Sequence, residues 1–227
     1  MTTKNLSPTD RTKLGRIPQR GVYDCETIYQ ILDEAPYCQL AVSLQGNPVV
    51  LPTMHTRIDN KLYIHGAKEN RLLNHIAQGA QACISATLLD GLVLAKSGLH
   101  HSMNFRSVVI YSTGIEITDP KLKTKALETL VNQIAPQRWN DSRPPTDAEL
   151  KVTKVIEFPL EEASAKVRTG PPMDDKRDQE LPYWSGNIPL KLVWETPVPD
   201  ATSDGIPLPA YLSRPHESLG KKWQASA

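Results

Sequence analysis

Two basic residues and an asparagine stand where a short apolar segment leads into a helical pattern. Residues 62–64 are apolar and β-prone, and after residue 71 apolar residues recur at helical spacing until Gly79. Lys68, Asn70 and Arg71 lie in the turn between them. The unpaired amides and positive dipole end of a starting helix favour an anion, and cationic side chains add charge-assisted hydrogen bonds. The pattern predicts a seat for a phosphorylated ligand, and an ordinary solvated turn is the alternative.

A second polar cluster precedes a strongly β-prone run. Residues 108–111 predict a strand that is buried on both faces. The residues expected at its entrance, as fixed hydrogen-bond donors, are Asn104, Arg106 and Ser107. Arg106 is costly to bury without an anionic partner. It therefore either binds an anionic ligand or pairs with a carboxylate such as Asp90 or Glu116.

Local signals predict the elements that position these residues. Asp119 and Pro120 supply an N-cap and a first-turn proline for a long amphipathic helix, and Thr146 with Glu149 forms a capping box for a short one. A short helix is expected over Thr27–Leu32. The expected strands are Tyr37–Leu44, Pro48–Thr53, Ala82–Leu88, Leu92–Ala95, Val152–Phe158 and Ala163–Val167. Lys166 and Arg168 are expected to face water at the end of the last strand.

Composition narrows the class of protein. The chain has 227 residues, of which 39% are hydrophobic and 22% charged, so it can bury one good core. Its net charge of +1 and low aromatic content argue against a nucleic-acid surface. No apolar run reaches membrane-spanning length, and the N-terminus lacks the apolar core of a signal peptide, so a cytoplasmic protein is expected.

The cysteines and histidines do not form a recognisable metal motif. Cys25, Cys38 and Cys83 are odd in number and widely spaced, which is typical of buried thiols in a reducing compartment. His100 and His101 are adjacent, and neighbours on a strand point to opposite faces. The sequence therefore predicts no metal site.

Ordered blocks of the chain resemble the pyridoxamine 5'-phosphate oxidase-related flavin-nucleotide-binding family, which includes the nitroimidazole-resistance proteins. These blocks are Arg16–Asp24, Gly46–Val50, Leu62–Ala67, Leu89–Ser97, Met103–Val109 and Pro182–Leu190. The resemblance implies a mainly β fold with flanking helices, a Greek-key split β-barrel. It also implies a homodimer that holds FMN at the subunit interface. The expectation of no nucleic-acid or membrane partner comes from the composition.

The resemblance also assigns site residues. In the family, one strand end lies along the flavin, the next turn faces its phosphate, a later strand entrance lies nearby, and the backbone of another strand contacts the ring edge. The strand end matches His65, Gly66 and Ala67, and the turn toward the phosphate matches Lys68, Asn70 and Arg71. The later strand entrance matches Asn104, Arg106 and Ser107. The strand at the ring edge matches Leu51 to Asp59, in which the contacting residues are Thr53, Met54, His55 and Thr56. His65 is the candidate for proton exchange with a substrate. The arginine and histidine set that binds pyridoxal phosphate is absent, so pyridoxamine phosphate is not the expected substrate.

These expectations define two regions and a function. Residues 14–170 are expected to form the barrel, and residues 171–227 a proline-rich extension that packs on the barrel or on the partner subunit. Tyr183 and Trp184 either cover the flavin or simply pack there. The expected function is an FMN-dependent oxidoreductase acting on a small molecule. The alternatives are a non-enzymatic flavin carrier or sensor, and a haem-binding split barrel with His100, His101 or His216 as axial ligand.

Overall fold

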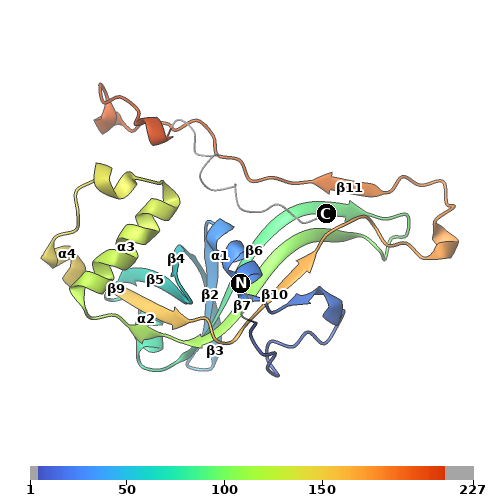
Figure 1. The fold of residues 1–227 in the computed structure, drawn as a ribbon, viewed down its shortest axis with the longest axis horizontal. Coiled ribbons are helices and arrows are strands. Elements are labelled where there is room, and N and C mark those ends of the chain that lie inside the picture. The colour runs from blue at the N-terminus through green and yellow to red at the C-terminus, as the bar shows by residue number, and fades with distance from the viewer. Residues whose placement is uncertain (1–4, 213–227) are drawn as a thin grey trace.

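The larger of two antiparallel sheets contains seven strands. In the computed structural model of the protein, which describes residues 5–212, its order is β1-β10-β7-β6-β2-β3, with β11 paired to β6 (Figure 1). Its strands are β1 (Gly21–Val22), β2 (Cys38–Leu44), β3 (Asn47–Thr53), β6 (Gln81–Leu94), β7 (Ser102–Thr113), β10 (Ala163–Arg168) and β11 (Gly186–Pro189). This sheet forms one side of the barrel.

The second sheet has four strands in the order β4-β5-β9-β8. They are β4 (His55–Ile58), β5 (Lys61–Ala67), β8 (Ile115–Glu116) and β9 (Thr153–Pro159). The chain passes from β3 to β4 at Met54 and changes sheet there, so the expected single strand from Leu51 to Asp59 is divided in two. Within residues 5–212, β3 and β4 are each an edge strand of their sheet.

Helices close the space between the sheets. The four α-helices of the described residues are α1 (Cys25–Glu34), α2 (Arg71–Ala77), α3 (Pro120–Ile134) and α4 (Asp147–Val152). Ile28, Ile31 and Leu32 of α1 are fully buried against strands of both sheets. At about 1.5–3 kcal/mol for each buried aliphatic side chain, this core is the main stabilising element of the fold.

Side-chain caps mark the starts of three helices, and the sequence predicted the caps at Asp119 and Thr146. The Asp24 carboxylate accepts a hydrogen bond from the amide of Thr27, and the Asp119 carboxylate accepts one from the amide of Lys121. Thr146 and Glu149 form the reciprocal capping box that their spacing predicted. Short 3-10 helices add single turns at Pro18–Arg20, Arg138–Asp141, Lys176–Asp178, Ala201–Ser203 and Ala210–Leu212.

The hairpin of β6 and β7 extends beyond the barrel as a long arm (Figure 1). The two predicted strands at 82–88 and 92–95 are one strand, β6, with an irregularity between Leu89 and Gly91. The prediction for β7 was wrong in two respects: the strand begins at Ser102, and it alternates between buried and half-buried residues instead of being buried on both faces. The polar residues expected at its entrance therefore lie within it.

The C-terminal extension leaves the barrel after β10 and returns along the arm. There β11 pairs with β6, and the chain then runs without a helix or strand as far as the 3-10 helix at Ala201–Ser203 (Figure 1). Further along, the Tyr211 hydroxyl donates a hydrogen bond of 2.7 Å to Asp141, beyond the end of α3. Among residues 5–212, no helix has both the length and the apolar character needed to span a bilayer.

Candidate functional site

The turn from β5 into α2 presents two unpaired cations. The side chains of Lys68 and Arg71 are exposed and make no hydrogen bond or ion pair with described residues. Gly66 allows α2 to approach β5, because a Cβ at this position would lie 2.8 Å from Leu73 Cδ1. The two basic side chains therefore stand together on a tightly packed strand-to-helix turn.

The sequence suggested that the backbone amides of this turn could bind an anion, but two of them are already hydrogen-bonded. The Asn70 side-chain oxygen accepts hydrogen bonds from the amides of Leu72 and Leu73, at 3.0 and 3.2 Å. Asn70 is thus the N-cap of a helix of only seven residues, and two of the amides that were expected to be unpaired are bonded to its side chain. The side chains of Lys68 and Arg71 are the cationic groups that this turn offers to an anion.

His65 and Thr56 line a cavity beneath α3 that is too narrow to hold a water molecule. Neither the Thr56 hydroxyl nor Nδ1 of His65 has a hydrogen-bond partner among residues 5–212, although both atoms are buried. The cavity is lined by Thr56, Tyr63, Ile64, His65, Ala126, Leu127, Leu130 and Val155. Burial lowers the pKa of His65, which keeps the imidazole neutral near pH 7. Its two nitrogens then serve as one donor and one acceptor.

Sequence reasoning missed a polar network beside this cavity. The Tyr63 hydroxyl donates a 2.8 Å hydrogen bond to Glu157, and Lys61 lies 2.7 Å from the same carboxylate. Burial, followed by the interaction with Glu157, raises the pKa of Tyr63. The alternation of polar and apolar residues along β5 is the signal that places Lys61, Tyr63 and His65 on one face.

The residues expected to contact a flavin ring edge lie at the junction of the two sheets. Thr53 and Met54 are partly exposed, whereas the side chains of His55 and Thr56 point into the protein. His55 Nε2 lies 2.9 Å from the carbonyl of Leu32, and burial lowers the His55 pKa, so the neutral ring donates this hydrogen bond. A ligand at this junction can reach His55 and Thr56 only through their backbone.

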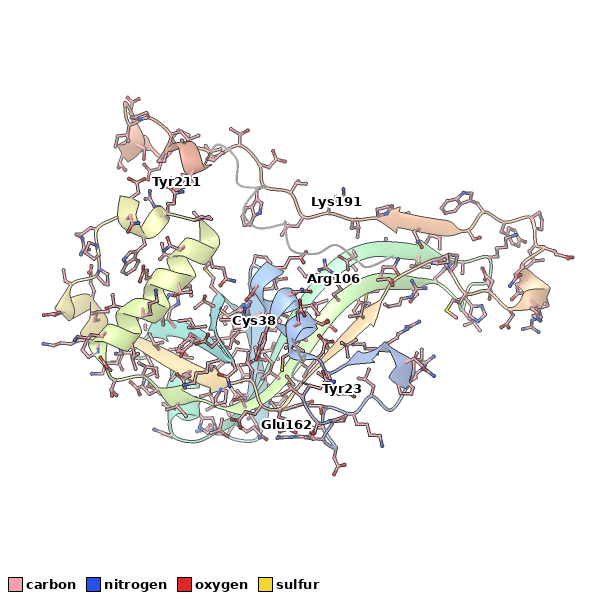
Figure 2. The ribbon with its side chains drawn as sticks, in the orientation of Figure 1. Tyr23, Cys38, Arg106, Glu162, Lys191 and Tyr211 are labelled. Carbon is pink, nitrogen blue, oxygen red and sulfur yellow. The ribbon has the colours of Figure 1, made fainter. Side chains whose placement is uncertain are left out.

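Arg106 is held by two carboxylates of the same chain. It is 5% exposed and makes paired hydrogen bonds to Asp90, at 2.7 and 3.0 Å, and to Glu34. These contacts join β7 to the irregular part of β6 and to the end of α1. Figure 2 labels Arg106 among the side chains of the molecule. Of the two interpretations of Arg106, pairing with Asp90 is the one that the structure shows.

The two neighbours of Arg106 in the predicted set also contact their own chain. The Asn104 amide donates to the carbonyl of Gly170, and its oxygen accepts a hydrogen bond from Arg168. The Ser107 hydroxyl donates to the carbonyl of Lys166. The structure therefore does not bring these residues together with Lys68 and Arg71 through any side-chain contact among described residues.

Arg168 was expected to face water and is instead 4% exposed. It donates to Asn104 and to the carbonyls of Gly170 and Pro171, while its buried Nε has no partner in the described part of the chain. Asn187 donates to the same Gly170 carbonyl. The buried guanidinium therefore organises the point where the extension leaves the barrel, which alternation along one strand did not predict.

The histidines considered as haem ligands differ in their hydrogen bonding. His100 and His101 lie in the loop before β7, so the argument that they point to opposite faces, which held only if a strand had begun there, does not apply. Nδ1 of His101 accepts a hydrogen bond from the amide of Ala95, so a neutral ring carries its proton on Nε2 and cannot coordinate through that atom. Nδ1 of His100 lies 3.7 Å from Asp174. His216 lies outside the described residues.

The side chains of Tyr183 and Trp184 are exposed, so the rest of the described chain leaves both rings largely uncovered. The Trp184 ring packs over Gly186, where a Cβ would come within 2.9 Å of it. In residues 5–212 there is no group of three or more His, Cys, Asp or Glu residues with the arrangement of a metal site.

The fold and sequence are shared with known proteins. Residues 24–167 match the family described as Pyridoxamine 5'-phosphate oxidase. The structure is similar to that of the flavocytochrome Anf3 from Azotobacter vinelandii, with 35% identity, a TM-score of 0.87, and coverage of 91% of this chain and 97% of that one. It is also similar to a FAD and haem binding protein from Mycobacterium smegmatis, with 30% identity, a TM-score of 0.81, and coverage of 85% and 95%.

A more distant structure, a 5-nitroimidazole antibiotic resistance protein from Bacteroides thetaiotaomicron, has 24% identity and a TM-score of 0.55 over 65% of this chain and 86% of its own. Curated proteins gave no match. These similarities confirm the mainly β split-barrel fold with flanking helices. The chain belongs to the pyridoxamine 5'-phosphate oxidase family.

Proposed function

We propose that this protein binds a flavin noncovalently and uses it in electron transfer to or from a small molecule. The observation that carries the proposal is the similarity, over nearly the whole chain, to a flavocytochrome and to a FAD and haem binding protein. A bound flavin supplies the redox chemistry at its ring, and the protein supplies binding, orientation and control of access. An oxidoreductase is therefore the best-supported function, with a flavin carrier or sensor as its non-enzymatic counterpart.

The residues present fit the phosphate end of a flavin. Lys68 and Arg71 lie three positions apart in one turn, and both side chains are exposed and unpaired with described residues, so they are free to hold an anion. Arginine matches phosphate geometry with two parallel donors, and lysine adds a point charge. The neighbouring strand end, from His65 to Ala67, would then lie along the ligand.

The ring end is assigned to the junction of β3 and β4. Both strands are sheet edges within the described residues, so backbone groups of residues 53–56 can face a ligand. FMN is the flavin that the sequence resemblance implies, whereas the Mycobacterium smegmatis relative is described with FAD. His65 stays the candidate for donating a hydrogen bond or exchanging a proton with a substrate, since its ring is neutral and unsatisfied.

A second chain completes this site in our proposal. β3 is an edge strand whose Val50 and Leu51 are exposed, and an exposed apolar edge favours association. Met54, at the expected flavin junction, is exposed beside them. A homodimer would cover this edge and enclose the ring.

Haem is a second candidate cofactor. Residues 171–227 make up a quarter of the chain, so matches that cover 91% and 85% of it necessarily include part of this extension. Both of these relatives are described as haem or cytochrome proteins. Nδ1 of His101 accepts a hydrogen bond, which places the proton of its neutral ring on Nε2. No such hydrogen bond fixes the ring of His100, so His100 is the candidate axial ligand among the described residues.

The first experiment is the absorption spectrum of the purified protein, with mass analysis of any released chromophore. Flavin bands with released FMN or FAD support the proposal and name the flavin, and a Soret band adds haem. A protein that is colourless and takes up neither flavin would refute the proposal.

Two variants then test the phosphate seat. Arg71→Gln and Lys68→Gln should each weaken flavin binding by about tenfold, which corresponds to about 1.4 kcal/mol. Lys121→Gln, at an exposed position on α3, is the matched control and should leave the affinity unchanged. Titration of the apoprotein, followed by flavin fluorescence, measures all three. Unchanged affinity in both variants would remove Lys68 and Arg71 from the site.

A further inference from the structure

Lys123 of α3 is a buried lysine on a helix face that is otherwise apolar. It lies on the same stripe as Ala126, Leu127 and Leu130, the residues of α3 that line the cavity under this helix. Lys123 is 9% exposed, and a lysine is rarely buried unless a partner compensates its charge. Within the described part of the chain, its ammonium group pairs with no carboxylate and donates instead to two backbone carbonyls.

The two carbonyls lie at the C-terminal end of α4. Nζ of Lys123 donates to the carbonyl of Thr153 at 2.8 Å and to that of Leu150 at 3.2 Å. A helix leaves its last carbonyls without partners of its own, and a cation beside them is stabilised by the helix dipole. Lys123 therefore caps α4 from the neighbouring helix, which gives the buried charge its compensation.

The same end of α4 is bonded from its other side to the basic turn between β5 and α2. The carbonyl of Val152 accepts a hydrogen bond of 2.8 Å from the backbone amide of Lys68. The next residue, Thr153, is aligned with Ala67 in the ladder of β5 and β9. The end of α4 thus lies between Lys123 and the backbone that carries Lys68.

This arrangement makes the position of Lys68 depend on Lys123. Figure 1 shows α3 and α4 side by side, and both α4 and α2 contact β9. Because α4 has only six residues, it depends on such contacts to keep its last turn in place. Without the ammonium group, two carbonyls at this turn lose their donor, and the backbone that binds the Lys68 amide is free to shift.

We propose that Lys123 is a positioning residue for the phosphate seat formed by Lys68 and Arg71. This inference rests on the flavin binding of the proposed function and deepens it. Lys123 touches no ligand: it holds the end of α4, and the end of α4 holds the amide of Lys68. A binding group is effective when its supporting residues fix it in place. Lys123 therefore contributes to the affinity for the phosphate group of a flavin and not to the affinity for its ring.

The preference of the apoprotein for FMN over riboflavin measures this role, because the two flavins differ in the phosphate group alone. Lys123→Met keeps most of the aliphatic volume and removes the ammonium group. It should lower the ratio of the two affinities by about fivefold and leave riboflavin binding nearly unchanged. Lys121→Met removes a charge from an exposed position of the same helix and is the matched control. Ile28→Val, in the buried core of α1, controls for a general loss of stability.

Thr146→Ala loosens the same support from the opposite end of α4. It removes the N-cap of this helix at an exposed position, so the barrel should fold normally. The ratio of FMN to riboflavin affinity should fall in the same direction as in Lys123→Met, by about twofold. This variant decides the test if Lys123→Met does not fold.

The outcomes separate this inference from the proposed function. A lower FMN preference in Lys123→Met, or in Thr146→Ala if the first variant does not fold, supports the inference when both controls keep the wild-type ratio. An unchanged ratio, or an equal fall in Ile28→Val, overturns it and leaves the phosphate seat to Lys68 and Arg71. A wild-type protein that binds FMN no better than riboflavin overturns the seat and this inference together, whereas flavin binding itself is judged from the spectrum.

Discussion

The contacts of Arg106 predict that this residue stabilises the fold. Replacing it by methionine keeps most of the aliphatic volume and removes four hydrogen bonds, two to Glu34 and two to Asp90. The two carboxylates then lose the cation between them. Glu34 lies in α1 and Asp90 in the irregular part of β6, so losing the Arg106 cation destabilises both elements.

The magnitude follows from burial. Breaking a buried ion pair from one side costs about 3–5 kcal/mol. The Arg106 side chain is 7% exposed, but those of Glu34 and Asp90 are 31% and 33% exposed and can regain water, which lowers the cost. We expect Arg106→Met to lower the free energy of unfolding by about 3 kcal/mol. For a domain of this size, this corresponds to a fall in Tm of roughly 6–12 °C.

Urea unfolding at one fixed protein concentration measures the effect, because association also changes apparent stability. The triple variant with Glu34→Gln and Asp90→Asn should recover much of the loss, since no unpaired charge remains. Arg177→Met, at an arginine whose side chain is 83% exposed, should have little effect. A loss below about 1 kcal/mol for Arg106→Met, or no recovery in the triple variant, would refute this account of Arg106.

Two further substitutions test the core and a buried imidazole. Gly114→Ala should lower the free energy of unfolding by about 2–3 kcal/mol, because the added Cβ would lie 2.4 Å from Ile156 Cγ2. Gly15→Ala is the control and should change it little, because the space around Gly15 is open. Equal Tm values for the two variants would contradict this account of the packing at Gly114. The folded-state pKa of His55 is lowered by burial from its ordinary 6.5, so its neutral form stabilises the protein fully above that pH and loses this contribution as the pH falls below it. Urea midpoints at pH 7.5 and 5.5 should therefore fall less in His55→Gln than in the wild type, and an identical fall would exclude this role.

Much of the secondary structure was predictable because its signals are local. The N-caps Asp24, Asp119 and Thr146 bind amides two or three residues away, so their effect is present in the sequence itself. The strands β2, β9 and β10 follow apolar patterns that the prediction recovered to within one residue at most boundaries. The basic turn between β5 and α2 was also recognised from neighbouring residues.

The partners of the buried polar groups came only from the tertiary structure. Arg106 meets Glu34, 72 residues away, and Arg168 meets Asn104, 64 residues away. The sequence offers many carboxylates at such separations, and local spacing does not select among them. The same limit applies to Asn70, whose side chain satisfies amides that the sequence left open to an anion.

Short-range hydrogen bonding and hydrophobic periodicity act over a few residues, so the capped helices and the alternating strands could be predicted from the sequence. The ordered sequence blocks were enough to show the resemblance to a flavin-binding family. The packing of distant segments decided that the chain changes sheet at Met54 and that Arg168 is buried. These outcomes depend on which surfaces meet when distant segments pack, and burial is a property of the packed molecule and not of any one segment.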